Sequence, residues 1–395
     1  MFFDYPGFIL IIVNSEILPK EARQKEAKRY NKLSRWISIS ELGLAIIFLM
    51  VLLFGLSHKI RDFSQSVFFS DFLVIFLYLV LVGLIYEIIT FPLNLYSGFT
   101  LEHKFYLSQQ KFLSWFSDHL KSLCISFVLS LFLVETLYFL IKSFPFYWWF
   151  LSAFMFILFF IVLAKISPLF ILPLFYKFEP LEDEDLKIRL MNLVEKAKSK
   201  VIGVFKWGLS QKTKKANAAL VGWGNTRRII LSDTLLENYT ADEIETVLAH
   251  ELGHWVKKHM WKGMGLQIIL SFLGFWVAFR LLNSTSGYFK LKGVDDIAGL
   301  PLLILVFSVL SLVFLPWVNL YSRRLETESD LIALELTKKP EAFISAMEKL
   351  TSQNLAEYQP NRIIHFIFHS HPSPAQRIKL AEKSAAIKRY EKELL

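Results

Sequence analysis

Six long apolar runs dominate the pattern of hydrophobic and polar positions along this chain. A helix needs about 20 mostly apolar residues to cross a bilayer, and each run is long enough. The runs lie at about residues 37–57, 70–95, 120–141, 146–175, 263–283 and 299–321. The pattern predicts an all-α protein that crosses a membrane several times.

The composition supports the same class. Hydrophobic residues make up 54% of the 395 residues, which include 38 Phe, and the mean hydropathy is +0.42. Two soluble domains of this total length would be far less apolar. The single cysteine, Cys124, falls inside an apolar run, so we expect neither a disulfide framework nor a cysteine nucleophile.

The N-terminus has only a short apolar run, residues 7–13, which is about half of what a span needs. We do not expect this run to cross the membrane alone. Asp4, Pro6 and the lack of a basic leader also argue against a cleaved signal peptide.

The distribution of positive charge predicts the orientation. Residues 16–35 form a strongly basic segment that should stay in the cytoplasm. Threading the six runs from there puts the connections 58–69, 142–145 and 284–298 outside, and these are poor in positive charge. Residues 96–119, 176–262 and the tail after 321 fall inside with most other Lys and Arg. Topology therefore explains the net charge of +9 more simply than a nucleic-acid partner does.

Four ionisable residues fall within the apolar runs: Glu87, Glu135, Lys165 and Arg280. Charged groups are costly against lipid, so we expect these side chains to face an internal, wet space. The alternative for Lys165 and Arg280 is that they reach the interface from near a helix end.

The longest polar region, residues 176–262, begins with a charged amphipathic helix. Residues 218–221 and 228–231 then alternate around Gly224 and Asn225, which predicts a short β-hairpin. An edge strand there could hold an extended peptide, or the hairpin could simply pack.

A helix is predicted over residues 240–260, and it carries the motif His250-Glu251-Leu252-Gly253-His254. Thr240 and Glu243 have the spacing of a capping box. His250 and His254 lie on one helix face, so both imidazoles can reach one zinc ion, with Glu251 placed to take a proton from water. The alternative is a helix whose histidines only pack or face solvent.

Catalytic zinc usually takes a third protein ligand. His259 is excluded, because on a continuous helix it would lie on the opposite face from His250. The pattern HExxHxxGxxH also fails, because Lys257 stands where glycine should be.

A carboxylate from another helix is the better candidate for the third ligand. Glu326 and Asp330 lie four residues apart on a helix that continues the last span. Glu326 could bind zinc while Asp330 accepts a hydrogen bond from a ligand histidine. Glu328 should point away into solvent. An ordinary charged helix face remains the alternative.

His371 precedes Pro372 and is held in a turn between His369 and Pro374. Near zinc, its imidazole could donate to an oxyanion. The alternative is a solvated loop histidine.

These motifs resemble those of the type I CAAX prenyl proteases, which are integral membrane zinc metalloendopeptidases. The similarity covers nearly the whole chain, and the motifs follow the order of the family. They are LNLYSGFTLEHKFYLSQQKFLSWFSDHLK, PLFYKFEPLEDEDLK, ANAALVGWGNTRRIILSDTLL, AHELGHW, NLYSRRLETESD and SHPSPAQRI.

The resemblance implies a barrel of about seven transmembrane helices around a hydrated chamber, with a gluzincin-like zinc domain. It implies one zinc ion per chain, with roles for nine residues. Zinc would be bound by His250, His254 and Glu326, with Glu251 as the general base and Asp330 behind the ligands, while Asn217 and Ala218 would lie by the substrate backbone and His371 and Arg377 would complete the wall.

Two features depart from the family pattern. The first span is shortened to residues 7–13, so one stave of the barrel would be incomplete. The usual EFQAD reads Glu326-Thr327-Glu328-Ser329-Asp330, which keeps the spacing and changes the residues between.

Five segments are expected. They are an N-terminal remnant and basic segment (1–36), four spans (37–175), a cytoplasmic zinc domain (176–262), two spans (263–321) and cytoplasmic helices that complete the site (322–395).

The resemblance implies removal of the C-terminal tripeptide from prenylated CAAX proteins, in the bacterial inner membrane or the endoplasmic reticulum according to source. The expected partners are a peptide or protein C-terminus, prenylated or not, and the lipid bilayer. A second hypothesis is a quality-control zinc protease for membrane proteins without prenyl specificity. A third is a transporter with a structural zinc site. Such a site would use four ligands, and no cysteine lies near His250.

Overall fold

The computed structural model describes residues 20–222 and 224–393. Within them, six helical stretches are long and apolar enough to cross a membrane. They are Glu21–Val67, Asp71–Lys104, Phe112–Ser143, Trp148–Leu174, His259–Thr285 and Ile297–Thr337. The six spans predicted from the apolar runs are confirmed.

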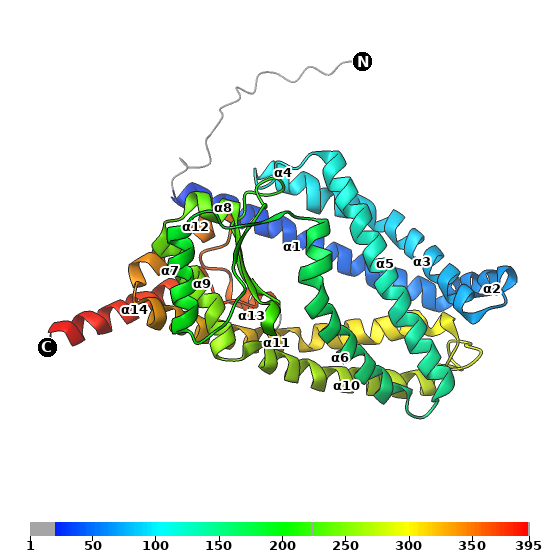
Figure 1. Ribbon diagram of the computed structural model, residues 1–395. Helices are drawn as coiled ribbons and strands as arrows, with labels where there is room; N and C mark the ends of the chain where they lie inside the picture. Colours follow the sequence, from blue (N-terminus) through cyan, green and yellow to red (C-terminus); the bar gives the residue numbers. More distant parts are fainter. Residues whose placement is uncertain (1–19, 223, 394–395) are drawn as a thin grey trace, which may run out of the picture.

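The membrane helices follow the chain in a simple order (Figure 1). They are α1 (Lys20–Val51), α2 (Ser57–Val67), α3 (Asp71–Leu95), α4 (Glu102–Lys104), α5 (Phe112–Ser143), α6 (Trp148–Ile166), α10 (His259–Thr285) and α11 (Leu300–Thr337). Short π-helical turns at Leu52–Leu56, Tyr96–Leu101 and Ser167–Ile171 extend α1, α3 and α6, and 3₁₀ turns lie at Leu172–Leu174 and Ile297–Gly299.

The six spanning helices form a closed ring. Each helix contacts the next one in the order α1, α3, α5, α6, α10 and α11, and α11 packs back against α1. This closed cycle of neighbouring helices confirms the barrel. The expected first stave, residues 7–13, lies outside the described residues, so the count of seven stays a prediction.

The end of the ring away from the polar region is tied together by a buried polar network. Arg61 pairs with Asp296, and the Ser57 hydroxyl lies 2.6 Å from the Tyr78 hydroxyl. The connection expected at residues 58–69 is largely a helix, α2, whose buried face carries Ser57, Ile60, Arg61 and Ser64.

The ionisable residues of the spans have different surroundings. Glu87 Oε1 lies 2.7 Å from His119 Nε2. Glu135 Oε1 is buried without a hydrogen-bond partner, whereas Lys165 and Arg280 are exposed. The wet interior expected to hold all four stays a prediction.

The polar region contains a small sheet and a group of helices. The strands are β1 (Phe178–Pro180), β2 (Val204–Trp207), β3 (Ala218–Val221) and β4 (Arg228–Ser232), in the order β1-β2-β4-β3. The helices are α7 (Glu184–Lys196), α8 (Asp233–Asn238), α9 (Ala241–Val256), α12 (Pro340–Gln353), α13 (Arg362–Phe368) and α14 (Pro374–Glu393), with a 3₁₀ turn at Gly224–Thr226.

The predicted hairpin is confirmed. β3 and β4 are antiparallel, with Ala218 opposite Leu231 and Val221 opposite Arg228. β4 also pairs in parallel with β2, which the alternation pattern did not predict, and the hairpin is therefore one side of a four-stranded sheet. β3 is consequently an edge strand.

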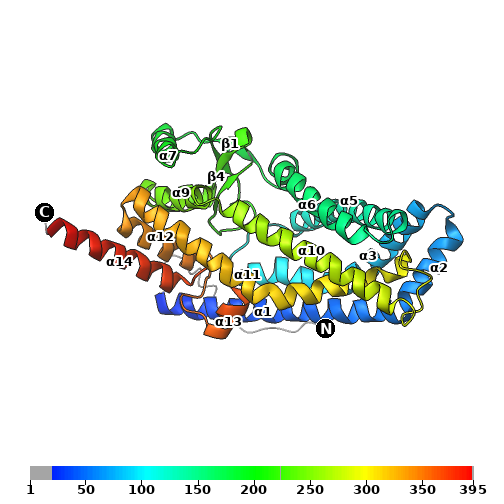
Figure 2. The ribbon, with the colours of Figure 1, turned by 90° about the horizontal axis from the view of Figure 1, so that it is seen from below.

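The sheet and α7, α9, α12 and α14 share one apolar core at one end of the molecule. Figures 1 and 2 show these helices together at that end, with α2 at the other end of the ring. α11 runs from the ring into this core. This helix therefore connects the membrane ring to the apolar core of the polar region.

Candidate metal centre

The helix α9 is fixed at its start by the predicted capping box. Thr240 Oγ1 accepts from the Glu243 backbone N–H at 3.3 Å, and Glu243 Oε2 accepts from the Thr240 N–H at 2.8 Å. Burial alone would raise the pKa of Glu243, but hydrogen bonds from Lys349 and Ser345 on α12 outweigh it and lower that pKa. The carboxylate thus joins α9 to α12 as well as capping α9.

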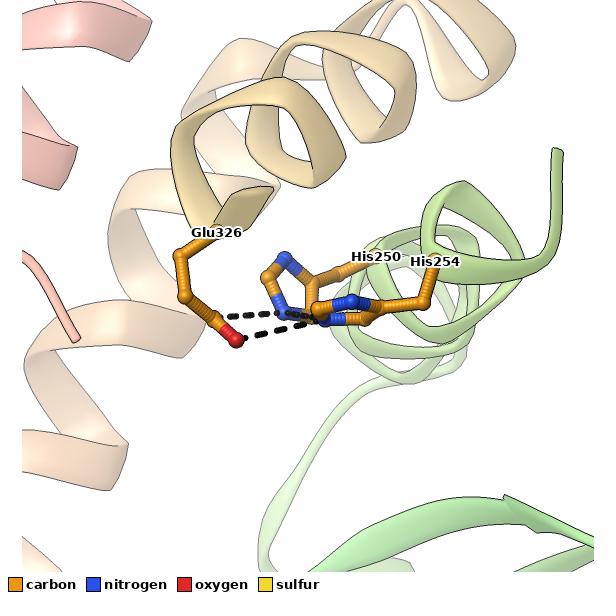
Figure 3. Close-up of side chains that lie close together, drawn as sticks. All are labelled: His250, His254 and Glu326. Atoms are coloured by element: carbon orange, nitrogen blue, oxygen red, sulfur yellow. Dashed lines mark hydrogen bonds and ion pairs between the residues drawn. The ribbon is translucent and has the colours of Figure 1, made fainter. Parts of the chain in front are cut away.

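Three side chains converge between α9 and α11. The Nε2 atoms of His250 and His254 lie 3.2 Å apart. Glu326 reaches them from α11, with its Oε2 3.3 Å from His250 Nε2 and its Oε1 3.4 Å from His254 Nε2. Figure 3 shows the two imidazoles and the carboxylate pointing at one another. One ligand atom from each lies within 4.8 Å of the other two.

The two helices can come this close because Gly253 faces α11. A Cβ atom on Gly253 would lie 2.9 Å from the Ser329 Cα and 3.0 Å from the Ser329 carbonyl oxygen. Any larger residue would therefore push the helix that carries Glu326 away from the histidines.

The convergent group suits a divalent metal ion. Two imidazole nitrogens and a carboxylate are the donors that catalytic zinc takes together with a water. Glu326 Oε2 is buried and makes no hydrogen bond of good geometry. Such a buried oxygen is costly unless a cation lies against it.

Asp330 lies behind His250. His250 Nδ1 is 2.8 Å from Asp330 Oδ1, which leaves Nε2 directed at Glu326. The guanidinium of Arg377 is committed to the same carboxylate, donating to Oδ2 at 2.8 Å and to Oδ1 at 2.5 Å. Arg377 also lines the cavity beside the group, and its expected place in the wall of the site stays a prediction.

The two histidines differ in their proton affinity. Burial alone would lower the pKa of His250, but its contacts with the carboxylates of Asp330 and Glu326 outweigh it and raise that pKa to about 9. Burial and the neighbouring His250 lower the pKa of His254 to about 4. A metal ion has to displace the proton from His250, so its binding should weaken as the pH falls.

A cavity of about 520 Å³ opens beside the group. Its lining includes Glu251, Asn217, Ala218, His369 and His371. Burial raises the pKa of the Glu251 carboxyl. A carboxylate with a raised pKa, facing a cavity next to metal ligands, can accept a proton from water.

Asn217 and Ala218 stand at the start of the edge strand β3. The Asn217 backbone N–H donates to Ser232 Oγ and its carbonyl accepts from the Ser232 N–H, both at 2.9 Å. These bonds hold the strand end at the cavity.

His371 lies in the predicted turn, with its side chain 62% exposed. Its Nε2 is 3.4 Å from Glu326 Oε1, and its Nδ1 is 3.0 Å from Ser370 Oγ. The structure therefore brings His371 to the open side of the metal group. His369, two residues earlier, lines the same cavity.

One expectation around the site was wrong. The helix does not continue to residue 260. It ends at Val256, and Lys258 has a φ of 54°, so His259 begins α10 and lies against His254 instead of on an opposite face. Glu328 points away from the metal group and is 42% exposed, but it also pairs with His259 and Lys262, which was not expected.

Two family models match adjoining parts of the chain. Residues 13–177 match the model described as "CAAX prenyl protease N-terminal, five membrane helices". Residues 180–385 match the model described as "Peptidase family M48".

Several relatives share both parts. The chain is 33% identical to the uncharacterized metalloprotease YhfN of Bacillus subtilis, covering 85% of this chain and 80% of the relative. It is 32% identical to the CAAX prenyl protease 1 homolog of Arabidopsis thaliana, covering 74% and 70%. It is 28% identical to CAAX prenyl protease 1 of Saccharomyces cerevisiae, covering 81% and 73%.

A solved structure has the same fold. The crystal structure of S. mikatae Ste24p matches with a TM-score of 0.83, covering 94% of this chain and 91% of the other at 23% identity. The similarity of fold therefore covers the membrane ring as well as the polar region.

Proposed function

We propose a specific reaction for this chain, which belongs to peptidase family M48 and is a membrane metalloendopeptidase. The reaction is zinc-dependent removal of the last three residues from prenylated CAAX proteins. The observation that carries the proposal is the convergence of His250, His254 and Glu326 in a chain that is similar over its length to proteins named CAAX prenyl protease 1.

Zinc held by the two imidazoles and the carboxylate would supply a Lewis acid and lower the pKa of a bound water. Glu251 accepts the proton of the attacking water, because its carboxylate faces the cavity and its pKa is raised toward neutrality by burial. It then returns the proton to the leaving amine.

Asp330 holds the proton on His250 Nδ1, so the Nε2 lone pair stays directed at the metal position. Arg377 keeps Asp330 ionised and fixed. The exposed His371 imidazole lies on the open side of the group, where it can donate to the oxygen that becomes negative during attack.

The substrate backbone is proposed to lie along β3, the edge strand that begins beside Asn217 and Ala218. A peptide can extend such an edge by main-chain hydrogen bonds. This arrangement would lay the scissile carbonyl across the cavity next to Glu251.

The test uses the purified full chain with two peptides of the same CAAX sequence, one farnesylated and one not. The proposal predicts release of the C-terminal tripeptide from the farnesylated peptide, its loss with a zinc chelator and its return on adding zinc. Equal cleavage of both peptides would instead favour a membrane zinc protease without prenyl specificity.

We also place the metal centre and the C-terminal helices on the cytoplasmic side, because the basic start of α1 lies at that end of the ring. Cysteines introduced at the exposed Ser66 and Ser284, in a Cys124→Ser background, should react with an impermeant thiol reagent from the opposite side. Labelling of these positions from the cytoplasm would reverse the orientation.

A further inference from the structure

We propose that His259, held by Glu328, sets the tautomer and ring orientation of the metal ligand His254. The inference deepens the proposed zinc site and rests on it. His259 is then a positioning residue, which orients His254 as Asp330 orients His250.

The geometry is a short chain of three side chains. His254 directs Nε2 at the metal group, 3.2 Å from His250 Nε2, and its Nδ1 lies 3.1 Å from His259 Nδ1. On the far side of the ring, His259 Nε2 lies 3.0 Å from Glu328 Oε2. The imidazoles of His254 and His259 meet edge to face, with their centroids 5.1 Å apart.

The protons in this chain can be placed from its far end. The Glu328 carboxylate only accepts, so His259 must carry a hydrogen on Nε2. A neutral His259 then presents a lone pair at Nδ1, and His254 must donate its Nδ1–H to that lone pair. The Nε2 of His254 is left without a hydrogen, which is the form that binds a metal.

A second donor supports the same tautomer of His259. The Ser329 hydroxyl lies 3.3 Å from His259 Nδ1 and can donate to it. The other neutral tautomer of His259 would carry its hydrogen on Nδ1, which faces neighbours that can themselves donate. Its Nε2 would then have no hydrogen to donate to the Glu328 carboxylate.

The helix break explains how His259 reaches this position. α9 ends at Val256, and the positive φ of Lys258 turns the chain so that α10 starts at His259. The side chain of His259 is 4% exposed, between α9 and α11. A polar ring buried to this extent needs hydrogen-bond partners, and the partners here lead to His254.

The two carboxylates that support the ligand histidines differ in how far they are buried. Asp330 is 1% exposed and is held by Arg377, whereas Glu328 is 42% exposed and is held by Lys262 at 2.9 Å. Water can replace part of the role of Glu328. We therefore expect loss of His259 to matter more than loss of Glu328.

The experiment measures the zinc dissociation constant of the purified full chain by competition with a chromophoric chelator. His259→Phe keeps a buried ring but removes the acceptor, and it should weaken zinc binding by about 10- to 100-fold. His259→Asn places its Oδ1 near the former Nδ1 position, so it should restore most of the affinity although it fills less volume.

The ranking separates positioning from packing, because a packing role favours phenylalanine over asparagine. Glu328→Leu provides a second test at a half-exposed site and should weaken zinc binding by less than His259→Phe. Lys262→Ala is the control, since it removes the other partner of Glu328 and leaves His259 in place.

Wild-type affinity in His259→Phe, or weaker binding in His259→Asn than in His259→Phe, would overturn this inference alone. A wild-type chain that binds no zinc would overturn the proposed zinc site, and this inference with it.

Discussion

Replacing Gly253 by alanine tests whether the close approach of α9 and α11 holds the metal centre together. The added Cβ would lie 2.9 Å from the Ser329 Cα, which is closer than real Cβ atoms come, and the helices would have to separate by about 0.5 Å to restore the ordinary contact distance of 3.4 Å. The obstructing atoms belong to the backbone of α11 and cannot rotate away.

The separation displaces Glu326, one helical turn from Ser329, relative to the two histidines. Metal sites tolerate deviations of about 0.2 Å in their ligand distances. Overpacking of this kind typically costs about 1–3 kcal/mol. If the free energy of zinc binding is reduced by this amount, zinc binding should weaken by about 5- to 150-fold.

Zinc affinity is measured by chelator competition, with Tm recorded on the same preparation. Gly265→Ala on α10 is the matched control, because a Cβ there would meet nothing within 4 Å. Wild-type zinc affinity in Gly253→Ala would refute the idea that this contact sets the spacing of the ligands.

Three further predictions concern individual side chains. Glu326→Ala should abolish tight zinc binding, whereas Asp330→Ala should weaken it by about 10- to 100-fold, as measured by metal content after dialysis; equal losses would argue against separate roles. His371→Ala should keep zinc and lower kcat by about 10²- to 10³-fold, and an equal loss in His369→Ala would argue against an oxyanion donor. The lowered pKa of Glu243 means that its stabilising contribution is present above the ordinary glutamate pKa of about 4.3 and is lost as the pH falls through the lower folded value. The fall in Tm on acidification should therefore be shallower in Glu243→Gln, and an unchanged slope would contradict this.

Much of the fold could be predicted because its signals are local. The spans follow from apolar runs matched to the bilayer, and the start of α9 follows from the capping box at Thr240. The hairpin followed from alternation around Gly224 and Asn225. The pairing of β4 with β2 was missed because β2 is only four residues long and its partner lies more than 20 residues away.

The metal group could be proposed from spacing, but its surroundings could not. A continuous helix puts His259 and His250 on opposite faces, and only the left-handed turn at Lys258 reverses this. No turn signal marks that position, because a lysine there has to adopt a conformation that favours glycine. The pairing of Glu328 with His259 was missed because α10 returns beside α11, a tertiary contact that helix periodicity does not contain.

In the proposed zinc-dependent hydrolase, Glu251 takes the proton and does not hold the metal. The most direct test measures zinc content and cleavage of the farnesylated CAAX peptide in wild type and Glu251→Gln, in parallel. We expect one zinc ion per chain in both proteins and cleavage only in wild type. A Glu251→Gln chain that loses its zinc, or that retains normal cleavage, would contradict it.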